Sequence, residues 1–265
     1  MNGEHWLLVA LAGLVAGAVN AVAGGGSMLS FPALVAAGMQ PLQANVTNAV
    51  GLLSGYFGGS VAYREELKET RGAVRRYAAA AVLGAVCGTC LLLLLPAEVF
   101  EAVVPGLIVA GCLLVVVQPR LTEAVSRRRD MNRNKNKSRN KSGDRDEDGA
   151  PAALALPCLF GAGAYGAYFG AGLGVILFAT LALLQHEVQQ ANALKALLSL
   201  AVNLVAAVLF AFFAPVDWGV AAVLAVTSLV GGVAGGRFAR RLSDRNLRLA
   251  VLLAGIGGAV WLVTS

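Results

Sequence analysis

Charged side chains are scarce in this chain of 265 residues: Asp, Glu, Lys and Arg make up 14% of it, against 57% hydrophobic residues. A soluble domain usually carries about 25% charged residues. Apolar runs of about 20 residues, long enough for a helix to cross the hydrocarbon core, recur along the whole length. The composition excludes an ordinary water-soluble domain and predicts an all-α integral membrane protein.

Histidines and buried carboxylates are also scarce. The two histidines, His5 and His186, are too few for a zinc site of the usual kind. No carboxylate is expected to be buried in a span, since Glu187 and Asp217 sit in predicted loops. A carboxylate proton relay is therefore excluded, and coupling to protons would have to use His186, Glu187 or the substrate itself. No catalytic constellation appears, so we expect neither an enzyme nor a cofactor.

The four cysteines do not indicate redox chemistry or a bound metal. Cys87 and Cys90 form a C-x-x-C pattern, but it lies inside an apolar run without a basic residue or His to activate a thiolate. Cys112 and Cys158 are also in apolar segments. We expect all four to serve as small packing residues.

The basic residues are concentrated between the apolar runs. All but one of the 21 Lys and Arg fall between Arg64 and Arg76, between Arg120 and Arg145, or between Arg237 and Arg248. This placement is typical of cytoplasmic loops and argues against nucleic acid as the partner of a chain with net charge +6. The start of the chain has no basic n-region, so the first run is predicted to be a retained span. We expect a multi-pass inner (plasma) membrane protein with both termini outside.

The apolar runs predict ten segments in two groups of five. Residues 1–118 form a first transmembrane repeat, residues 119–150 a disordered, basic cytoplasmic linker, and residues 151–265 a second repeat. The linker is interpreted as a solvated tether, with contact to anionic lipid headgroups as the alternative. The predicted segments are 6–23, 27–39, 42–63, 74–95 and 99–118, then 152–169, 172–185, 189–212, 218–236 and 246–264.

Charge and sequence both predict that the two halves are related and inverted. With the basic clusters inside, the loops at 96–101 and 215–217 lie outside, and five segments per half reverse the second half relative to the first. The run at 24–27 corresponds to 170–173, and Gln43-Ala44-Asn45 corresponds to Gln190-Ala191-Asn192. In this alignment Asn48 pairs with Lys195.

Two short segments, 27–39 and 172–185, follow glycine runs that break a helix. A break at membrane depth survives only inside the protein or facing a wet cavity. The half-helix that follows offers N–H groups and a positive dipole end, which suits an anion. Two inverted copies predict one anion site near the midplane, whereas the alternative is that these glycines only allow close packing. For the pairs Gly13 and Gly17, Gly55 and Gly59, Gly84 and Gly88, and Gly232 and Gly236 we expect packing alone.

Lys195 is the only charged residue well inside an apolar segment. A buried ammonium predicts a function, here holding the anion by charge, while snorkelling to the headgroups is the alternative. Amides and hydroxyls near the repeat signature could replace the hydration shell of the anion, whereas Ser54, Tyr56 and Ser199 are assigned to packing. The predicted substrate-binding set is Asn20, Gly24, Gly25, Gly26, Ser27, Asn45, Thr47, Asn48, Gly170, Gly172, Asn192 and Lys195.

Two blocks of the chain resemble a known family, the sulfite exporter TauE/SafE family, also called the toluene-sulfonate uptake permeases. The first block runs from Ala16 to Ser27 with Phe31-Pro32-Ala33-Leu34 and Val46-Thr47-Asn48, and the second from Gly170 to Lys195. The resemblance implies export or uptake of sulfite, thiosulfate, sulfonates or related anions. The family often has a Lys after the Thr-Asn pair, where this chain has Ala49, so Lys195 is the remaining candidate charge.

The first hypothesis is a secondary transporter that moves a small sulfur-containing anion by alternating access. Export is the expected direction. A permease or channel for another small organic anion is the rival within transport, and a membrane enzyme or sensor is the rival outside it. Membrane lipids are expected partners, and the sequence leaves a homodimer open.

Overall fold

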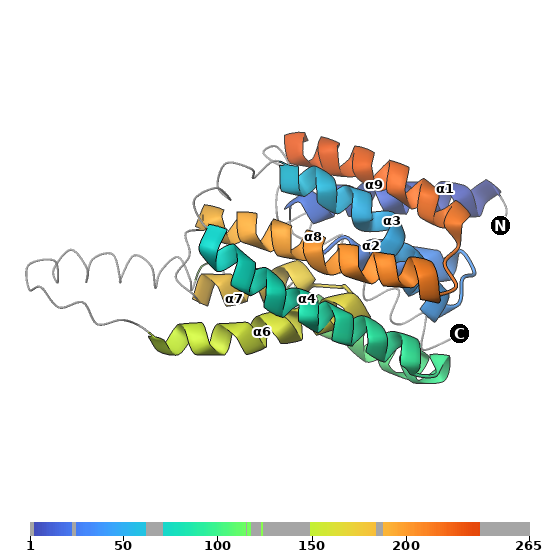
Figure 1. Ribbon diagram of the computed structural model, residues 1–265. Helices are drawn as coiled ribbons and strands as arrows, with labels where there is room; N and C mark the ends of the chain where they lie inside the picture. Colours follow the sequence, from blue (N-terminus) through green and yellow to red (C-terminus); the bar gives the residue numbers. More distant parts are fainter. Residues whose placement is uncertain are drawn as a thin grey trace, which may run out of the picture.

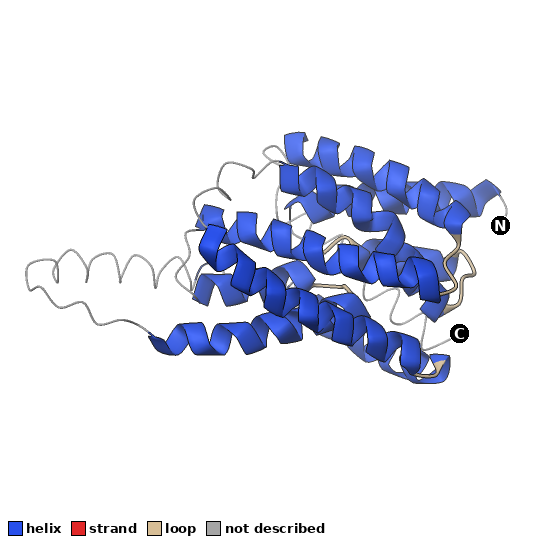
Figure 2. Ribbon diagram, viewed as in Figure 1, coloured by secondary structure: helices blue, strands red, loops and turns tan. Residues whose placement is uncertain are grey.

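The computed structural model describes residues 3–22, 25–61, 71–114, 116–117, 123, 149–183 and 188–238. These residues are helical apart from short turns, and no strand occurs among them (Figures 1 and 2). The helices are α1 (Gly3–Val22), α2 (Ser27–Ala36), α3 (Pro41–Val61), α4 (Arg71–Leu94), an unlabelled helix over Ala97–Leu114, α6 (Gly149–Tyr168), α7 (Leu173–Leu183), α8 (Val188–Phe213) and α9 (Trp218–Phe238).

Each predicted segment corresponds to a helix, except 246–264, which lies outside the described residues. The loop predicted at 96–101 is shorter in the structure, because the Val99 N–H already bonds the Pro96 carbonyl at 3.1 Å and the next helix begins at Ala97. Proline is well suited to a helix start, so the chain turns at once. Helix α6 begins at Gly149, inside the end of the predicted linker, and most of that linker lies outside the described residues.

The internal repeat is present in the helix order. Helices α6 and α7 begin 146 residues after α1 and α2, and α8 and α9 begin 147 residues after α3 and α4. Corresponding helices run in opposite directions: α4 and α9 are drawn running opposite ways, as are α3 and α8 (Figure 1). The described helices therefore have the order and directions expected of two inverted repeats, and the fifth segment of the second repeat lies outside the described residues.

The first helix of each repeat packs mainly against a helix of the other repeat. Helix α1 of the first repeat packs mainly on α9 of the second, and α6 of the second packs mainly on α4 of the first. A methyl group at Gly17 would overlap the Ser228 carbonyl, and one at Gly163, the equivalent position, would overlap the Ala81 carbonyl. Small residues at these crossings let the backbones approach closely, as the sequence predicted for Gly17.

A second pair of close helix contacts between the two repeats is related in the same way. A methyl group at Gly84 would overlap the Phe160 carbonyl, and one at Gly231 would overlap the Leu14 carbonyl. Since each contact has its counterpart with the halves exchanged, an approximate two-fold axis relates the described helices of the two repeats. Of the equivalent helix pairs, α3 and α8 pack directly against each other.

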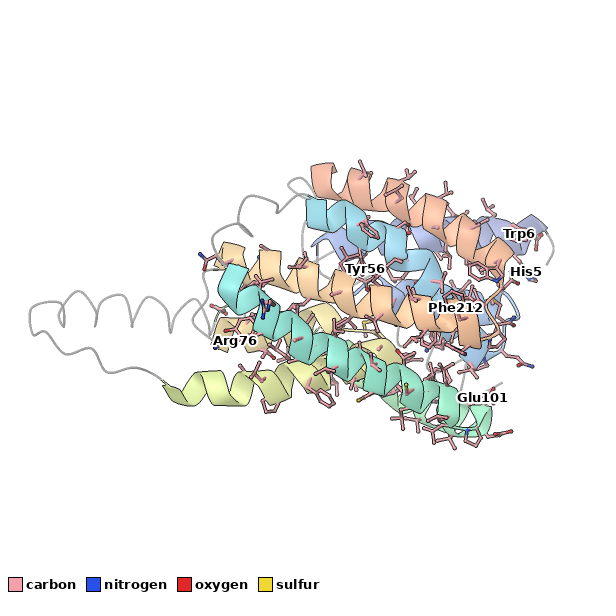
Figure 3. The ribbon with its side chains drawn as sticks, in the orientation of Figure 1. His5, Trp6, Tyr56, Arg76, Glu101 and Phe212 are labelled. Carbon is pink, nitrogen blue, oxygen red and sulfur yellow. The ribbon has the colours of Figure 1, made fainter. Side chains whose placement is uncertain are left out.

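The bundle has two distinct ends (Figure 3). We call the end that holds the exposed Arg75 and Arg76, at the start of α4, the basic end. The far end holds Glu101 and His5, which Figure 3 places opposite Arg76. Helices α2 and α7 each cover only part of the bundle length, so α1 with α2 forms a hairpin that returns to the far end, and α6 with α7 one that returns to the basic end (Figure 1).

The outside of the bundle is apolar, as a lipid-facing surface requires. Five of the described helices are long and apolar enough to span a membrane. Leu94, Phe212, Phe213 and Trp218 are among the most exposed side chains. Trp6 lies near the far end (Figure 3), and Trp and Tyr side chains typically mark the membrane–water interface. The chain is thus a multi-pass membrane protein.

Candidate functional site

The first helix break lies between α1 and α2 and is closed by Asn20. The Asn20 Oδ1 accepts a hydrogen bond of 2.7 Å from the Gly26 N–H. Gly26 itself has an ordinary helical backbone, with φ −60° and ψ −31°. What requires glycine there is close approach, because a methyl group would overlap the Ala16 carbonyl and lie 2.8 Å from Asn20 Cγ. The N-terminus of α2 is thereby fixed against the last two turns of α1.

The second helix break, between α6 and α7, is built differently. Gly170 and Gly172 both have φ of +79°, a left-handed conformation that favours glycine. The Tyr165 hydroxyl donates a hydrogen bond of 2.7 Å to the Ala171 carbonyl between them. The two breaks are related by the repeat, yet one is held by an amide and a close contact and the other by positive φ and a phenol.

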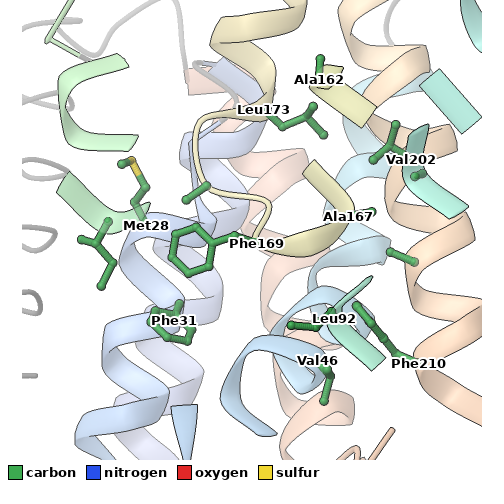
Figure 4. Packing of buried hydrophobic residues seen from close by; sticks show 14 of the residues in the cluster. Met28, Phe31, Val46, Leu92, Ala162, Ala167, Phe169, Leu173, Val202 and Phe210 are labelled. Carbon is green, nitrogen blue, oxygen red and sulfur yellow. The ribbon is translucent and has the colours of Figure 1, made fainter. Parts of the chain in front are cut away.

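The two breaks meet at the centre of the bundle. A Cβ at Gly170 would lie 3.8 Å from Ser27 Oγ, the first residue of α2. Beside this contact the rings of Phe31 and Phe169 pack edge to face, with centroids 5.3 Å apart (Figure 4). The prediction that both glycine runs approach one place is supported by this geometry, and Phe169 adds an apolar wall that the sequence analysis did not identify.

A cluster of four uncharged polar side chains surrounds this meeting point. The side chains of Asn20, Ser27 and Asn203 all lie near the Tyr56 hydroxyl. Ser27, Tyr56 and Asn203 are 7%, 9% and 4% exposed. The four residues come from α1, α2, α3 and α8, so both repeats contribute. We call them the central polar cluster.

One hydrogen-bond donor of the central polar cluster has no partner among the described residues. Asn20 Nδ2 is buried and makes no hydrogen bond to any described residue, while its Oδ1 is engaged by Gly26. Hydroxyl groups of Ser27 and Tyr56 can donate as well as accept. The N-terminus of α2 adds the positive end of a helix dipole. Together these groups can replace part of the hydration shell of an anion.

Two of the predicted binding residues have structural partners instead. Asn45 Nδ2 donates to the Tyr168 carbonyl at 2.9 Å, at the last residue of α6. Thr47 Oγ1 accepts a hydrogen bond of 3.0 Å from the Asp217 N–H. Both bonds join α3 of the first repeat to a chain segment of the second. They hold the start of α3 in place at the far end.

The remaining predicted residues are spread along α3 and α8. Asn48 precedes Tyr56 by eight residues and Lys195 precedes Asn203 by eight, which is about 12 Å along each helix. Because α3 and α8 run in opposite directions, Asn48 lies toward the far end and Lys195 toward the basic end (Figure 1). The structure therefore does not bring Asn48 and Lys195 together. Lys195 and Asn192 are half-buried, Gly25 is buried, and Gly24 lies outside the described residues.

Sequence analysis assigned Tyr56 to packing and did not select Asn203. The signal that identifies them is the repeat itself, because an offset of 147 residues pairs Tyr56 with Asn203, and the pair meets at the two-fold axis. Ser54 is a packing residue as predicted, since its hydroxyl donates to the Ala225 carbonyl at 2.6 Å. Among the described residues no group of His, Cys, Asp or Glu could hold a metal ion.

Comparison with known proteins agrees with this architecture. The model of the family "Sulfite exporter TauE/SafE" matches residues 9–262. The chain is 28% identical to the probable membrane transporter protein ORF9 of a Sinorhizobium species, over 96% of this chain and 90% of the relative. It is 26% identical to the probable membrane transporter protein YfcA of Escherichia coli K12, over 91% of this chain and 82% of the relative.

A probable membrane transporter protein of Haemophilus influenzae is 25% identical, over 91% of this chain and 88% of the relative. No solved structure matches the chain. The family match extends over both repeats, both helix breaks and every residue of the central polar cluster. The chain belongs to the sulfite exporter TauE/SafE family of membrane transporters.

Proposed function

We propose that this transporter moves a small sulfur-containing anion, such as sulfite or an organosulfonate, and that the central polar cluster binds it during alternating access. The observation that carries the proposal is the meeting of two inverted helix breaks at Ser27 and Gly170, beside the buried donor of Asn20. Inverted repeats with broken helices at their interface are a common plan of secondary transporters. The family match supports the sulfur-containing anion as the substrate class and export as the direction.

The chemistry of the central polar cluster fits an oxyanion. The amide of Asn20 and the hydroxyls of Ser27 and Tyr56 are compact donors from three different helices. An oxyanion with three or four oxygens can accept from several donors at once, whereas a halide presents one small sphere. Because these donors carry no charge, they can hold an anion without making its release prohibitively slow.

Alternating access needs a site that can be exposed to either side. The α1–α2 hairpin returns to the far end and the α6–α7 hairpin to the basic end. Each hairpin therefore stands between the central polar cluster and one end of the bundle. Movement of one hairpin at a time would open the cluster to one end of the bundle. The approximate two-fold axis makes the movements of the two hairpins equivalent.

The test is flux of radiolabelled sulfite, thiosulfate and an organosulfonate into proteoliposomes that hold the purified full chain. A transporter should saturate and show counterflow, and Tyr56→Phe and Asn203→Ala should lower the apparent affinity by about tenfold, the equivalent of losing one hydrogen bond to a charged group. Thr180→Val is the matched control, because Thr180 only bonds the Ile176 carbonyl of its own helix. Flux of none of these anions, or equal flux in all variants, would refute the proposal, and non-saturating flux would favour a channel.

A further inference from the structure

Polar side chains form one stripe on α3 and a second on α8. Asn45, Asn48 and Tyr56 recur at three- and eight-residue spacing on α3, and Asn192, Lys195, Ser199 and Asn203 recur at the equivalent positions of α8. Residues spaced three or four apart share one face of a helix. We call these the α3 stripe and the α8 stripe.

The two stripes join at the centre and lead to opposite ends. The side chains of Tyr56 and Asn203 lie near each other where α3 packs against α8. From there the α3 stripe leads toward the far end and the α8 stripe toward the basic end, because the helices are antiparallel (Figure 1). Together the stripes form one line of polar groups along most of the length of the bundle, through the central polar cluster.

Asn48 gives independent evidence that this line meets a ligand or water. Its side chain is 3% exposed, and its Oδ1 is buried without a hydrogen-bond partner among the described residues. An unpaired buried acceptor is costly, at about 1–3 kcal/mol. Its neighbours Asn45 and Thr47 are both paired with backbone groups. Asn48 is therefore the residue on the α3 stripe with a free polar group.

The two stripes are unequal at two equivalent positions. The α8 stripe carries Lys195 where the α3 stripe carries the neutral Asn48. It also carries Ser199 where the α3 stripe carries Leu52, which is 1% exposed and packs with Ala16, Tyr56 and Leu200. The α8 stripe is thus polar at every position and carries one basic residue, while an apolar residue interrupts the α3 stripe next to the centre.

We propose that the substrate anion crosses the bundle along these two stripes, and that the stripes form two unequal legs of its path. On the α8 leg, Lys195 attracts the anion and Ser199 passes it to the central polar cluster. On the α3 leg, Leu52 is the barrier that closes the path between Asn48 and Tyr56. This inference rests on the proposed function for the existence of a transported anion, but it concerns the route and its two sides.

The first test measures access to the route without measuring transport. Single cysteines replace Leu52 or Ser199 in a background where Cys87, Cys90, Cys112 and Cys158 are alanine, and each protein is reconstituted and treated from either side with a small anionic or cationic methanethiosulfonate. Ser199→Cys should react from the basic end, about tenfold faster with the anionic reagent than with the cationic one, and Lys195→Asn should abolish that preference. Leu52→Cys should react slowly from both sides.

Thr180→Cys is the matched control, since Thr180 is buried on α7 outside both stripes. Equal reaction of the Leu52 and Ser199 variants, or a charge preference that survives Lys195→Asn, would overturn the proposal. These outcomes do not depend on which anion is transported. Absence of sulfur-anion flux together with the expected labelling pattern would therefore refute the proposed function and leave the route intact.

The second test needs no introduced cysteine. The ratio of KM measured from the basic end to KM measured from the far end should rise by about tenfold in Lys195→Asn. In the double variant Lys195→Asn with Asn48→Lys the charge moves to the other leg, and the ratio should rise further. Leu52→Ser should increase leak of the anion. An unchanged KM ratio in variants of wild-type thermal stability would contradict the inference.

Discussion

Asn20 Oδ1 accepts a 2.7 Å hydrogen bond from the Gly26 N–H across the first helix break, and its Nδ2 is left buried without a partner. One amide thus has two separable tasks. Its acceptor holds the N-terminus of α2 in place, and its donor faces the central polar cluster. Substitutions that remove one group and keep the other can tell structure from substrate binding.

Asn20→Ala should destabilise the protein and abolish transport, because the Gly26 N–H would be buried and unsatisfied at about 1–3 kcal/mol. Asn20→Asp keeps the acceptor but buries a carboxylate oxygen where Nδ2 lies, which costs free energy of its own, so its thermal stability in detergent should fall between those of the wild type and Asn20→Ala. Its anion affinity should fall strongly, since a carboxylate removes the donor and repels an anion. Equal anion affinity in wild type and Asn20→Asp would show that Nδ2 does not meet the substrate.

Gly163→Ala should destabilise the packing of α6 on α4, because a methyl group would overlap the Ala81 carbonyl. We expect a loss of about 1–3 kcal/mol, as for other overpacked sites. Gly161→Ala, two residues earlier on the same helix, is the matched control. No atom lies within 4 Å of its added methyl group, so it should be neutral or stabilising by up to about 1 kcal/mol. Thermal unfolding in detergent checks both, and equal midpoints would contradict the packing argument.

Gly172→Ala should impair transport, because Gly172 has φ +79° in the second break and an alanine there is strained by about 1–2 kcal/mol. Gly38→Ala introduces the same strain at φ +91°, in an exposed turn between α2 and α3. The two variants should lose similar stability, yet only Gly172→Ala should lose flux. Similar flux in both would show that the shape of the second break is not critical.

Arg76→Cys and Glu101→Cys should label from opposite sides of the membrane, because Figure 3 places these exposed residues at opposite ends of the bundle. The basic end is expected to face the cytoplasm under the positive-inside rule. An impermeant maleimide applied to intact cells should therefore label Glu101→Cys and spare Arg76→Cys, in a background without the native cysteines. Labelling of both from outside would contradict the span between them, and the reverse pattern would invert the orientation.

The membrane location, the helix positions and the inverted repeat were predictable from the sequence. Helix ends agree with prediction to within a few residues because hydrophobic length and the placement of Lys and Arg are local properties of the chain. The two short segments were identified for a similar reason, since a glycine run between apolar stretches interrupts a helix wherever it occurs.

Only the tertiary structure decided which polar side chains share the centre. Asn45 and Asn203 are both buried amides on apolar helices, and nothing in their neighbours along the chain distinguishes the one that caps α6 from the one that meets Tyr56. That difference depends on where α3 and α8 lie in the bundle, and the helices are placed by contacts between residues far apart in sequence, such as that of Gly17 on α1 with Ser228 on α9. Composition and periodicity determine where each helix begins and ends, because these properties act within a turn or two of the chain. Which side chains line the site depends on how the helices pack, and that packing depends on side-chain volumes in both repeats.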